Sequence, residues 1–263
     1  MAIITPQGHY LGWKRPLPGR GALEQLPHAD TTNLAVLPQV DPRKKMPPAV
    51  NQLALGSCTA NATGRAFRYD TIQDGKDCGE LSRLWIYYFE RSIEHTLDQG
   101  DCGAEGHDAF TVAKHGIPAE TLWPYDISKF EQKPPACWIP GHSGKRDYTL
   151  TKPVHAVPQN ETAFKQVLSN NQTIAYGFTV YRDFEEPWSI PGVMPEPNSS
   201  EEVLGGHENL LVGYLEEYPD HFLSLNSWGT SWGVFGGYFL FPKATILDSN
   251  MATDFRTIVR TVA

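Results

Sequence analysis

The sequence predicts an α+β protein with two lobes, the first helical and the second built from strands. Apolar residues recur at helical spacing in the first half of the chain, and short runs of β-branched and aromatic residues dominate the second half. Helices followed by strands favour this class over alternating βαβ units. The chain has 263 residues, 40% of them hydrophobic, which is enough for two packed lobes that share an interface.

Charge and hydropathy exclude several classes of protein. The formal net charge is −8 and no basic run is present, so a nucleic-acid partner is not expected. No apolar stretch approaches the roughly 20 residues of a membrane span, and the N-terminus lacks the apolar region of a signal peptide. We therefore expect no membrane association, and either a cytoplasmic location or export without a classical signal.

Residues 1–38 are expected to form an extended arm. Prolines and glycines are frequent there and leave little room for a helix or a central strand. Because Tyr10 and Trp13 would be unusual in a solvated tail, we expect the arm to lie on the folded body. The alternative is a disordered terminus.

Residues 39–148 are expected to form the helical lobe. One helix begins at Ser57, a good N-cap residue, and ends at Asp74-Gly75. A second follows Ser82 with an apolar stripe up to Ile93, and a third covers residues 108–114.

Residues 149–263 are expected to form the strand lobe, after a Pro/Gly-rich stretch at 133–144. One helix is expected at residues 161–168, with Asn160 as its cap. The predicted strands are 173–181, 203–214, 222–226, 237–241 and 255–262.

Four distant residues fit acyl transfer by a cysteine nucleophile. Cys58 would lie in the first turn of a helix, whose N-terminus stabilises a thiolate, and His207 could supply the imidazole. Asn226 could orient that ring, with Trp228 covering their hydrogen bond from water. Gln52 could bind the oxyanion together with the backbone N–H of Cys58.

Each of these residues also has a simpler explanation. A cysteine among small residues is usually a packed core thiol, and a lone histidine in a strand usually has a structural partner. Asn226 could belong to a turn, and Gln52 to a solvated loop. Their joint occurrence in this order makes the catalytic interpretation the better one.

Three motifs closely resemble the papain-like cysteine peptidases: N-Q-L-A-L-G-S-C at 51–58, G-H at 206–207 and N-S-W-G-T-S-W-G at 226–233. The resemblance covers about residues 37–245. It implies a papain-like fold, with a helical lobe that carries the cysteine, a β-barrel lobe that carries the histidine and asparagine, and a peptide cleft between them. It implies peptide or protein substrates and no cofactor.

The resemblance also implies the role of each residue. Gln52 would be the oxyanion-hole residue, Cys58 the nucleophile, His207 the acid and base, and Asn226 the orienting residue, with Trp228 as its shield. The glycine that binds the substrate backbone is either Gly103 or Gly106. Gly205, Gly206 and Trp228 are expected to line the cleft.

Departures from the family pattern indicate which branch of the family the chain resembles. Thr59 replaces the common aromatic residue after the nucleophile, and Leu55 replaces a cysteine that many members use in a disulfide. Such features, with a short leader, resemble the bacterial and viral members. Cys78, Cys102 and Cys137 remain besides Cys58, so at least one further thiol should be free unless it pairs between chains, and no cysteine pair has metal-ligand spacing.

Glu208 is unusual, because the family commonly has a small apolar residue directly after the histidine. That position lines the pocket for the substrate side chain two residues before the cleaved bond, so an acid predicts a preference for Lys or Arg. The alternative is that Glu208 binds a partner inside the barrel lobe.

The predicted function is that of a cysteine endopeptidase, which its own N-terminal arm would keep latent as an intramolecular inhibitor. Two alternatives remain open. One is an acyltransferase or amidase on the same fold, and the other is a non-catalytic binding protein on a degenerate peptidase fold.

Overall fold

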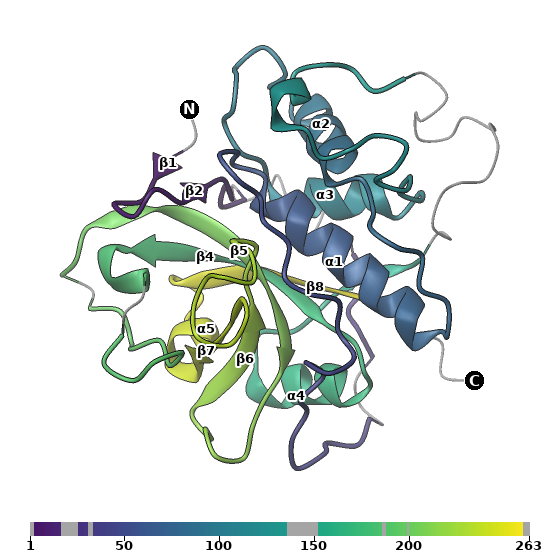
Figure 1. The fold of residues 1–263 in the computed structure, drawn as a ribbon. Coiled ribbons are helices and arrows are strands. Elements are labelled where there is room, and N and C mark those ends of the chain that lie inside the picture. Colours follow the sequence, from purple (N-terminus) through teal and green to yellow (C-terminus); the bar gives the residue numbers. More distant parts are fainter. Residues whose placement is uncertain are drawn as a thin grey trace.

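The structure, a computed structural model, describes residues 3–16, 26–30, 34–135, 152–185, 188–198 and 200–259. It has the expected α+β architecture, with the helices of the first half of the chain on one side of the molecule and the large sheet, together with the helices of the second half, on the other (Figure 1). Most of the Pro/Gly-rich stretch, Cys137 and the end of the last predicted strand lie outside the described residues.

The helical lobe contains α1 (Cys58–Gln73), α2 (Arg83–Ile93) and α3 (Gly106–Ala113), close to the predicted positions. The side chain of Ser82 accepts a hydrogen bond from the Trp85 amide and so caps α2 as expected. Ser57 occupies the N-cap of α1 without capping it. Its hydroxyl contacts the Tyr125 hydroxyl at 2.5 Å instead.

The strand lobe contains one antiparallel six-stranded sheet in the order β3-β8-β4-β5-β6-β7. The strands are β3 (Val154–Ala156), β4 (Ile174–Tyr181), β5 (Val203–Gly213), β6 (His221–Leu225), β7 (Tyr238–Pro242) and β8 (Ala252–Ile258). Helix α4 (Glu161–Ser169) is capped by Asn160, whose side chain accepts from the Ala163 amide, as predicted. Short helices complete the lobes: η2 (Ile127–Lys129), η4 (Arg182–Phe184) and α5 (Lys243–Leu247).

Two apolar clusters form the core of the molecule. The first joins α1, α2 and α3 to the outer face of the sheet and includes Trp85, Phe110, Leu210 and Leu225. The second fills the interior of the strand lobe with aromatic residues such as Tyr176 and Phe178. Because the first cluster spans both lobes, the seam between them is a packed core.

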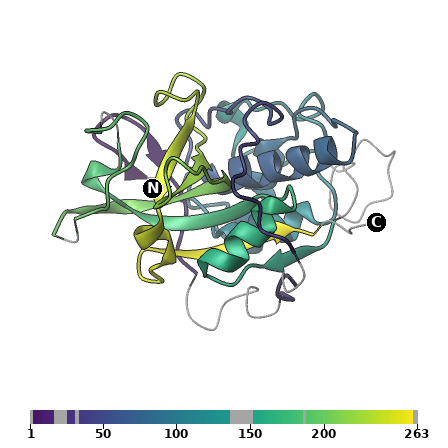
Figure 2. The same cartoon turned by 90° about the horizontal axis from the view of Figure 1, so that it is seen from below.

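Residues 3–11 form a hairpin of β1 (Ile3–Ile4) and β2 (Tyr10–Leu11), which lies on the sheet near the start of α1 (Figures 1 and 2). Leu11 and Trp13 are buried. This described part of the arm therefore packs on the body, as its aromatic residues predict. No helix among the described ranges is long and apolar enough to cross a membrane.

Candidate active site

Cys58 is the first residue of α1 and is fully buried. The turn before it is fixed by Asn61, whose amide donates to the carbonyl and hydroxyl oxygens of Ser57 at 2.8 and 3.0 Å. The thiol therefore lies at a helix N-terminus, where the dipole favours negative charge.

His207 lies on β5 and Asn226 directly follows β6. The Nε2–H of His207 donates to Asn226 Oδ1 at 2.8 Å, with the tautomer assigned from this contact. Trp228 packs over the imidazole, with ring centroids 4.8 Å apart. Nδ1 of His207 has no hydrogen-bond partner among the described residues, so this nitrogen remains available for proton transfer.

Gln52 joins the two lobes. Its backbone N–H donates to the Ser227 carbonyl at 2.8 Å, and its Oε1 accepts from the Ser227 hydroxyl at 2.7 Å. Its Nε2 donates to the Leu55 carbonyl and to the Tyr10 carbonyl, each at 2.9 Å. The amide that was predicted to bind an oxyanion thus binds a peptide carbonyl of the arm.

The arm continues through the site as an extended peptide. The Ala104 amide donates to Gly12 O at 2.8 Å, and the Lys14 amide donates to Ala104 O at 3.0 Å. Between these contacts the Trp13 amide donates to Gly206 O at 3.1 Å. Gly12 and Lys14 therefore bind the helical lobe, and Trp13 between them binds the strand lobe, as an extended peptide ligand would.

Gly12 lies directly over the loop before the nucleophile. A Cβ added at Gly12 would lie 1.8 Å from Gly56 O, so only glycine allows this approach. On the far side of His207, His9 stacks on Trp228 with centroids 4.2 Å apart and binds Glu185 Oε1 at 2.8 Å. The arm thus contacts both sides of the candidate catalytic residues.

Burial determines the charge of the thiol and of the imidazole. Desolvation, with a smaller effect from the Glu208 carboxylate, raises the pKa of Cys58 to about 12. Desolvation lowers the pKa of His207 to about 4, although Asn226 acts in the opposite direction. Both groups are therefore neutral near pH 7 in this state.

The predicted backbone-binding glycines lie in different places. Gly103 faces the arm, because a Cβ there would lie 2.0 Å from Gly12 O. Gly106 faces away from it and packs against Glu208 and Arg256. The residue that pairs with the arm backbone is Ala104, between the two candidates, and its N–H and C=O leave no signal in the sequence.

The remaining predicted cleft residues also face the arm. Gly205 lies under Ile3 and Leu11, and Gly206 lies under Trp13. Trp228 lies under His9. The two glycines have no side chain, and Trp228 presents the flat face of its ring. Both features leave room for a peptide backbone.

Glu208 is fully buried, and its Oε2 accepts from Arg256 Nη2 at 3.0 Å. Burial raises the pKa of Glu208 and the neighbouring Arg256 guanidinium lowers it, so the ion pair holds the charged form against desolvation. The carboxylate expected to bind a Lys or Arg of the substrate thus already has a cation. This geometry matches the alternative of a partner inside the molecule.

Thr59 has a clear structural role. Its hydroxyl donates to Glu90 Oε1 at 2.8 Å, inside the helical lobe. Burial raises the pKa of Glu90 well above its usual range. The sequence singled out Thr59 as a departure, but its partner is thirty-one residues away and only the packing of α1 on α2 brings them together.

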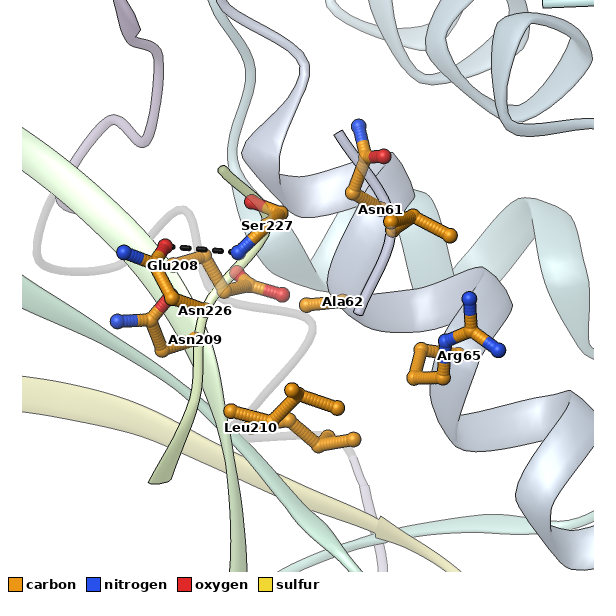
Figure 3. Close-up of a pocket in the computed structure, with 10 residues that line it drawn as sticks. Asn61, Ala62, Arg65, Glu208, Asn209, Leu210, Asn226 and Ser227 are labelled. Carbon is orange, nitrogen blue, oxygen red and sulfur yellow. Dashed lines mark hydrogen bonds between the residues drawn. The ribbon is translucent and has the colours of Figure 1, made fainter. Parts of the chain in front are cut away.

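A small cavity of about 10 Å³ lies below the site, between α1 and the strands. Figure 3 shows Asn61, Ala62 and Arg65 on one side of it and Glu208 and Asn209 on the other. This volume suits about one water molecule, so the cavity is an internal gap and not a substrate site.

Three carboxyl and imidazole groups gather at Glu105, His107 and Asp108. The two ring nitrogens of His107 face different carboxylates, 3.3 and 3.2 Å away, which is the arrangement of an ion-pair cluster. One imidazole cannot chelate a metal through both nitrogens.

Cys78 and Cys102 are free thiols, in agreement with the expectation that at least one thiol besides Cys58 is free.

Comparison with known proteins identifies relatives of the chain. The family described as papain family cysteine protease matches residues 37–257. An uncharacterised peptidase C1-like protein, L477, of Acanthamoeba polyphaga mimivirus is 34% identical over 216 residues, which cover 78% of this chain and 68% of that protein. Cysteine proteinase 3 of Entamoeba histolytica is 25% identical over 217 residues, covering 80% of this chain and 63% of that protein.

Solved structures match as well. The crystal structure of xylellain, a cysteine protease from Xylella fastidiosa, is 30% identical with a TM-score of 0.78, and the match covers 95% of this chain and 96% of that one. A digestive procathepsin L 3 of Tenebrio molitor, 19% identical with a TM-score of 0.65, covers 89% of this chain and 73% of that one, and shares the fold.

Proposed function

The chain belongs to the papain family of cysteine proteases, and on that premise we propose that it cleaves peptide bonds with Cys58 as nucleophile and His207 as acid and base. The observation that carries the proposal is the contact of Gln52 Nε2 with the Tyr10 carbonyl, 2.9 Å away. A peptide carbonyl is bound at the position where a developing oxyanion would need a donor.

The reaction follows from the positions of the groups. Once the arm has left, water and the helix dipole stabilise a thiolate at Cys58, and His207 holds the proton that the thiol has lost. The thiolate attacks the scissile carbonyl, and Gln52 Nε2 with the backbone N–H of Cys58 binds the oxyanion. His207 then protonates the leaving amine, which gives an acyl-enzyme and a free amino terminus.

Hydrolysis completes the cycle. His207 takes a proton from a water molecule, which attacks the acyl carbon and releases the carboxylic acid product and the Cys58 thiolate. Asn226 keeps the imidazole in the required orientation throughout, by its 2.8 Å contact with Nε2. No cofactor takes part in these steps.

The extent of the arm supports an endopeptidase. It contacts Trp228 through His9 on one side of the catalytic residues and Ala104 through Lys14 on the other. A site that accepts chain on both sides suits cleavage within a polypeptide.

The same contacts support latency. The arm occupies Gln52 with the Tyr10 carbonyl, covers Cys58 with Gly12, and places Lys14 Nζ 2.8 Å from the buried Glu94. Its docked conformation keeps the thiol and imidazole neutral, so the uncleaved chain would be a zymogen.

Covalent labelling by an epoxide reagent for cysteine peptidases tests the catalytic proposal. A chain whose arm has been removed or loosened should be labelled at Cys58, and Cys58→Ala should abolish labelling. Cys78→Ala is the matched control and should label normally. A protein that never labels, even without its arm, would support a non-catalytic role instead.

A further inference from the structure

Glu185, directly after η4, is a buried acid that the arm covers. Its side chain is only 1% exposed. Its Oε1 accepts hydrogen bonds from the Thr5 hydroxyl and from the Nδ1–H of His9, the latter at 2.8 Å. Its Oε2 has no hydrogen-bond partner among the described residues. The hydrogen bonds of this carboxylate within the described part of the chain thus all come from the arm.

The arm presents both donors from the loop between β1 and β2. The His9 amide donates to Thr5 Oγ1 at 3.0 Å, and the Thr5 amide donates to the His9 carbonyl at 2.8 Å. Departure of the arm removes both donors from Glu185 at once. A buried carboxylate without donors is unfavourable, so another donor that takes their place is bound strongly.

Trp228 gives this site a flat wall. The imidazole of His9 lies parallel to the indole of Trp228, with an interplanar angle of 7° and ring centroids 4.2 Å apart. The same imidazole reaches Glu185 with Nδ1. The group that fits the site is therefore planar, stacks on an aromatic face and donates to a carboxylate. We call Glu185 and Trp228 together the planar-cation site.

The guanidinium of an arginine meets these requirements best. It is planar and always charged, it stacks on aromatic rings, and it can donate two parallel hydrogen bonds to one carboxylate. The second of these bonds would reach Oε2 of Glu185, which His9 leaves without a partner. The ammonium group of lysine carries the same charge but is not planar and cannot stack in this way.

The planar-cation site lies close to the reacting groups. His9 directly precedes Tyr10, whose carbonyl accepts from Gln52 Nε2 at 2.9 Å. Trp228 also packs on His207, and, after desolvation, a positive charge at His9 is a further cause that lowers the pKa of His207. A substrate side chain bound here therefore belongs to one of the two residues nearest the cleaved bond on one side.

We propose that Glu185 and Trp228 form a subsite that selects an arginine side chain of the substrate near the cleaved bond, and that His9 occupies this subsite in the latent chain. The inference rests on the proposed peptidase function. It assigns recognition of a cation to Glu185 and not to Glu208, because the carboxylate of Glu208 already binds Arg256.

Full-length His9→Ala/Trp13→Ala is the background for the test, because it empties the planar-cation site and removes a buried contact of the arm. A substrate can follow the course of the arm in either direction. Reporter peptides therefore carry Arg at the first or second residue on either side of the cleaved bond. Each is matched with a citrulline peptide, which has nearly the same shape without the charge. The kcat/KM values are divided by the fraction of Cys58 that an epoxide reagent labels.

We expect the Arg peptide to exceed the citrulline peptide by about tenfold at one position, which is the usual effect of a hydrogen bond to a charged group. A Lys peptide at that position should be cleaved more slowly than the Arg peptide, because lysine does not stack. Equal rates for Arg and citrulline at every position would overturn the proposal.

Glu185→Gln in the same background should bring the Arg and citrulline rates to about parity, because the amide keeps the volume of the side chain and loses its charge. Glu216→Gln, at an exposed glutamate, is the matched control and should preserve the preference for Arg. A preference for Arg that persists in a labelled Glu185→Gln protein would refute the role of Glu185.

The arm itself provides a second test, which needs no substrate. In the full-length chain, His9→Glu should speed labelling of Cys58 by about tenfold or more relative to His9→Arg, because only the arginine attracts Glu185. Glu185→Gln should largely remove this difference. An equal difference with Glu185 and with Gln at position 185 would show that the two side chains do not interact.

The two proposals fail in distinguishable ways. A His9→Ala/Trp13→Ala chain that neither labels nor cleaves would overturn the peptidase proposal, and the subsite proposal with it. A chain that labels and cleaves but does not distinguish Arg from citrulline would overturn the subsite alone.

Discussion

Gln52 Nε2 donates a hydrogen bond to the Tyr10 carbonyl at 2.9 Å. The side-chain amide that is proposed to bind the oxyanion of the substrate therefore binds the chain's own N-terminal arm. Gln52 is itself held by Ser227, which belongs to the other lobe. The oxyanion donor, the arm and the lobe interface are therefore one connected set of contacts.

Removal of the arm should increase the rate of peptide cleavage. A chain that begins at Leu37 lacks the contacts of Tyr10, Gly12 and Trp13 with the cleft. If the docked arm is favoured by about 99 to 1, the gain should be about a hundredfold. The measurement is kcat/KM on one reporter peptide for both chains, and no gain would end the proposal of latency.

Ile4→Ala is the matched control for the arm. Ile4 belongs to the same hairpin but is 52% exposed, so its loss should change the cleavage rate little. A large gain from this variant would mean that any disturbance of the arm opens the site.

The reactivity of Cys58 should depend steeply on pH in the full-length chain. Because burial raises the thiol pKa to about 12, the thiolate fraction should rise about tenfold per pH unit between pH 7 and 9. His207, with its pKa near 4, is neutral over that range and cannot supply an ion-pair partner. Alkylation rates at Cys58, followed by peptide mapping, would measure this.

The shortened chain should behave differently, with alkylation near neutral pH that changes little with pH, since a solvated imidazolium can stabilise the thiolate. Cys78, a partly buried free thiol whose sulfur contacts Thr71 in the helical lobe, serves as the internal comparison in both chains. A flat profile in the full-length protein would show that the ion pair persists under the arm.

Gln52→Ala in the shortened chain should lower kcat by about 10² to 10³, the usual effect of losing one oxyanion donor. KM should change less, because the interaction strengthens in the transition state. Gln39→Ala, at an exposed glutamine, should have no effect. Equal activity in the Gln52 variant would remove this residue from the catalytic set.

Thr59→Val should lower the free energy of unfolding by about 1–3 kcal/mol, because the buried Glu90 carboxyl group loses its 2.8 Å donor. Thr63→Val, one turn later in α1, is the matched control. The Thr63 hydroxyl is buried without a hydrogen-bond partner among the described residues, so its replacement should change stability by less than about 0.5 kcal/mol. Urea unfolding of both variants distinguishes a specific hydrogen bond from general packing.

Much of the architecture could be predicted because its causes are local. The apolar stripe after Ser82 and the cap at Asn160 determine α2 and α4, and both occur where expected. The hairpin of the arm and the register shift between β4 and β8, at Ala175 and Gly177, could not be predicted. Their backbone conformations depend on partners far away in the chain, on Glu185 and on the β4 register.

The sequence by itself determined the reaction class, because a thiol, an imidazole and two carboxamides in a family-specific order leave few other uses. It also predicted that the N-terminal arm lies on the folded body, because the aromatic side chains of Tyr10 and Trp13 would be unfavourable in a solvated tail. Only the tertiary structure decided where the arm docks and what surrounds Glu208. The charge of a buried carboxyl group depends on its neighbours in space, and Arg256 lies forty-eight residues away along the chain.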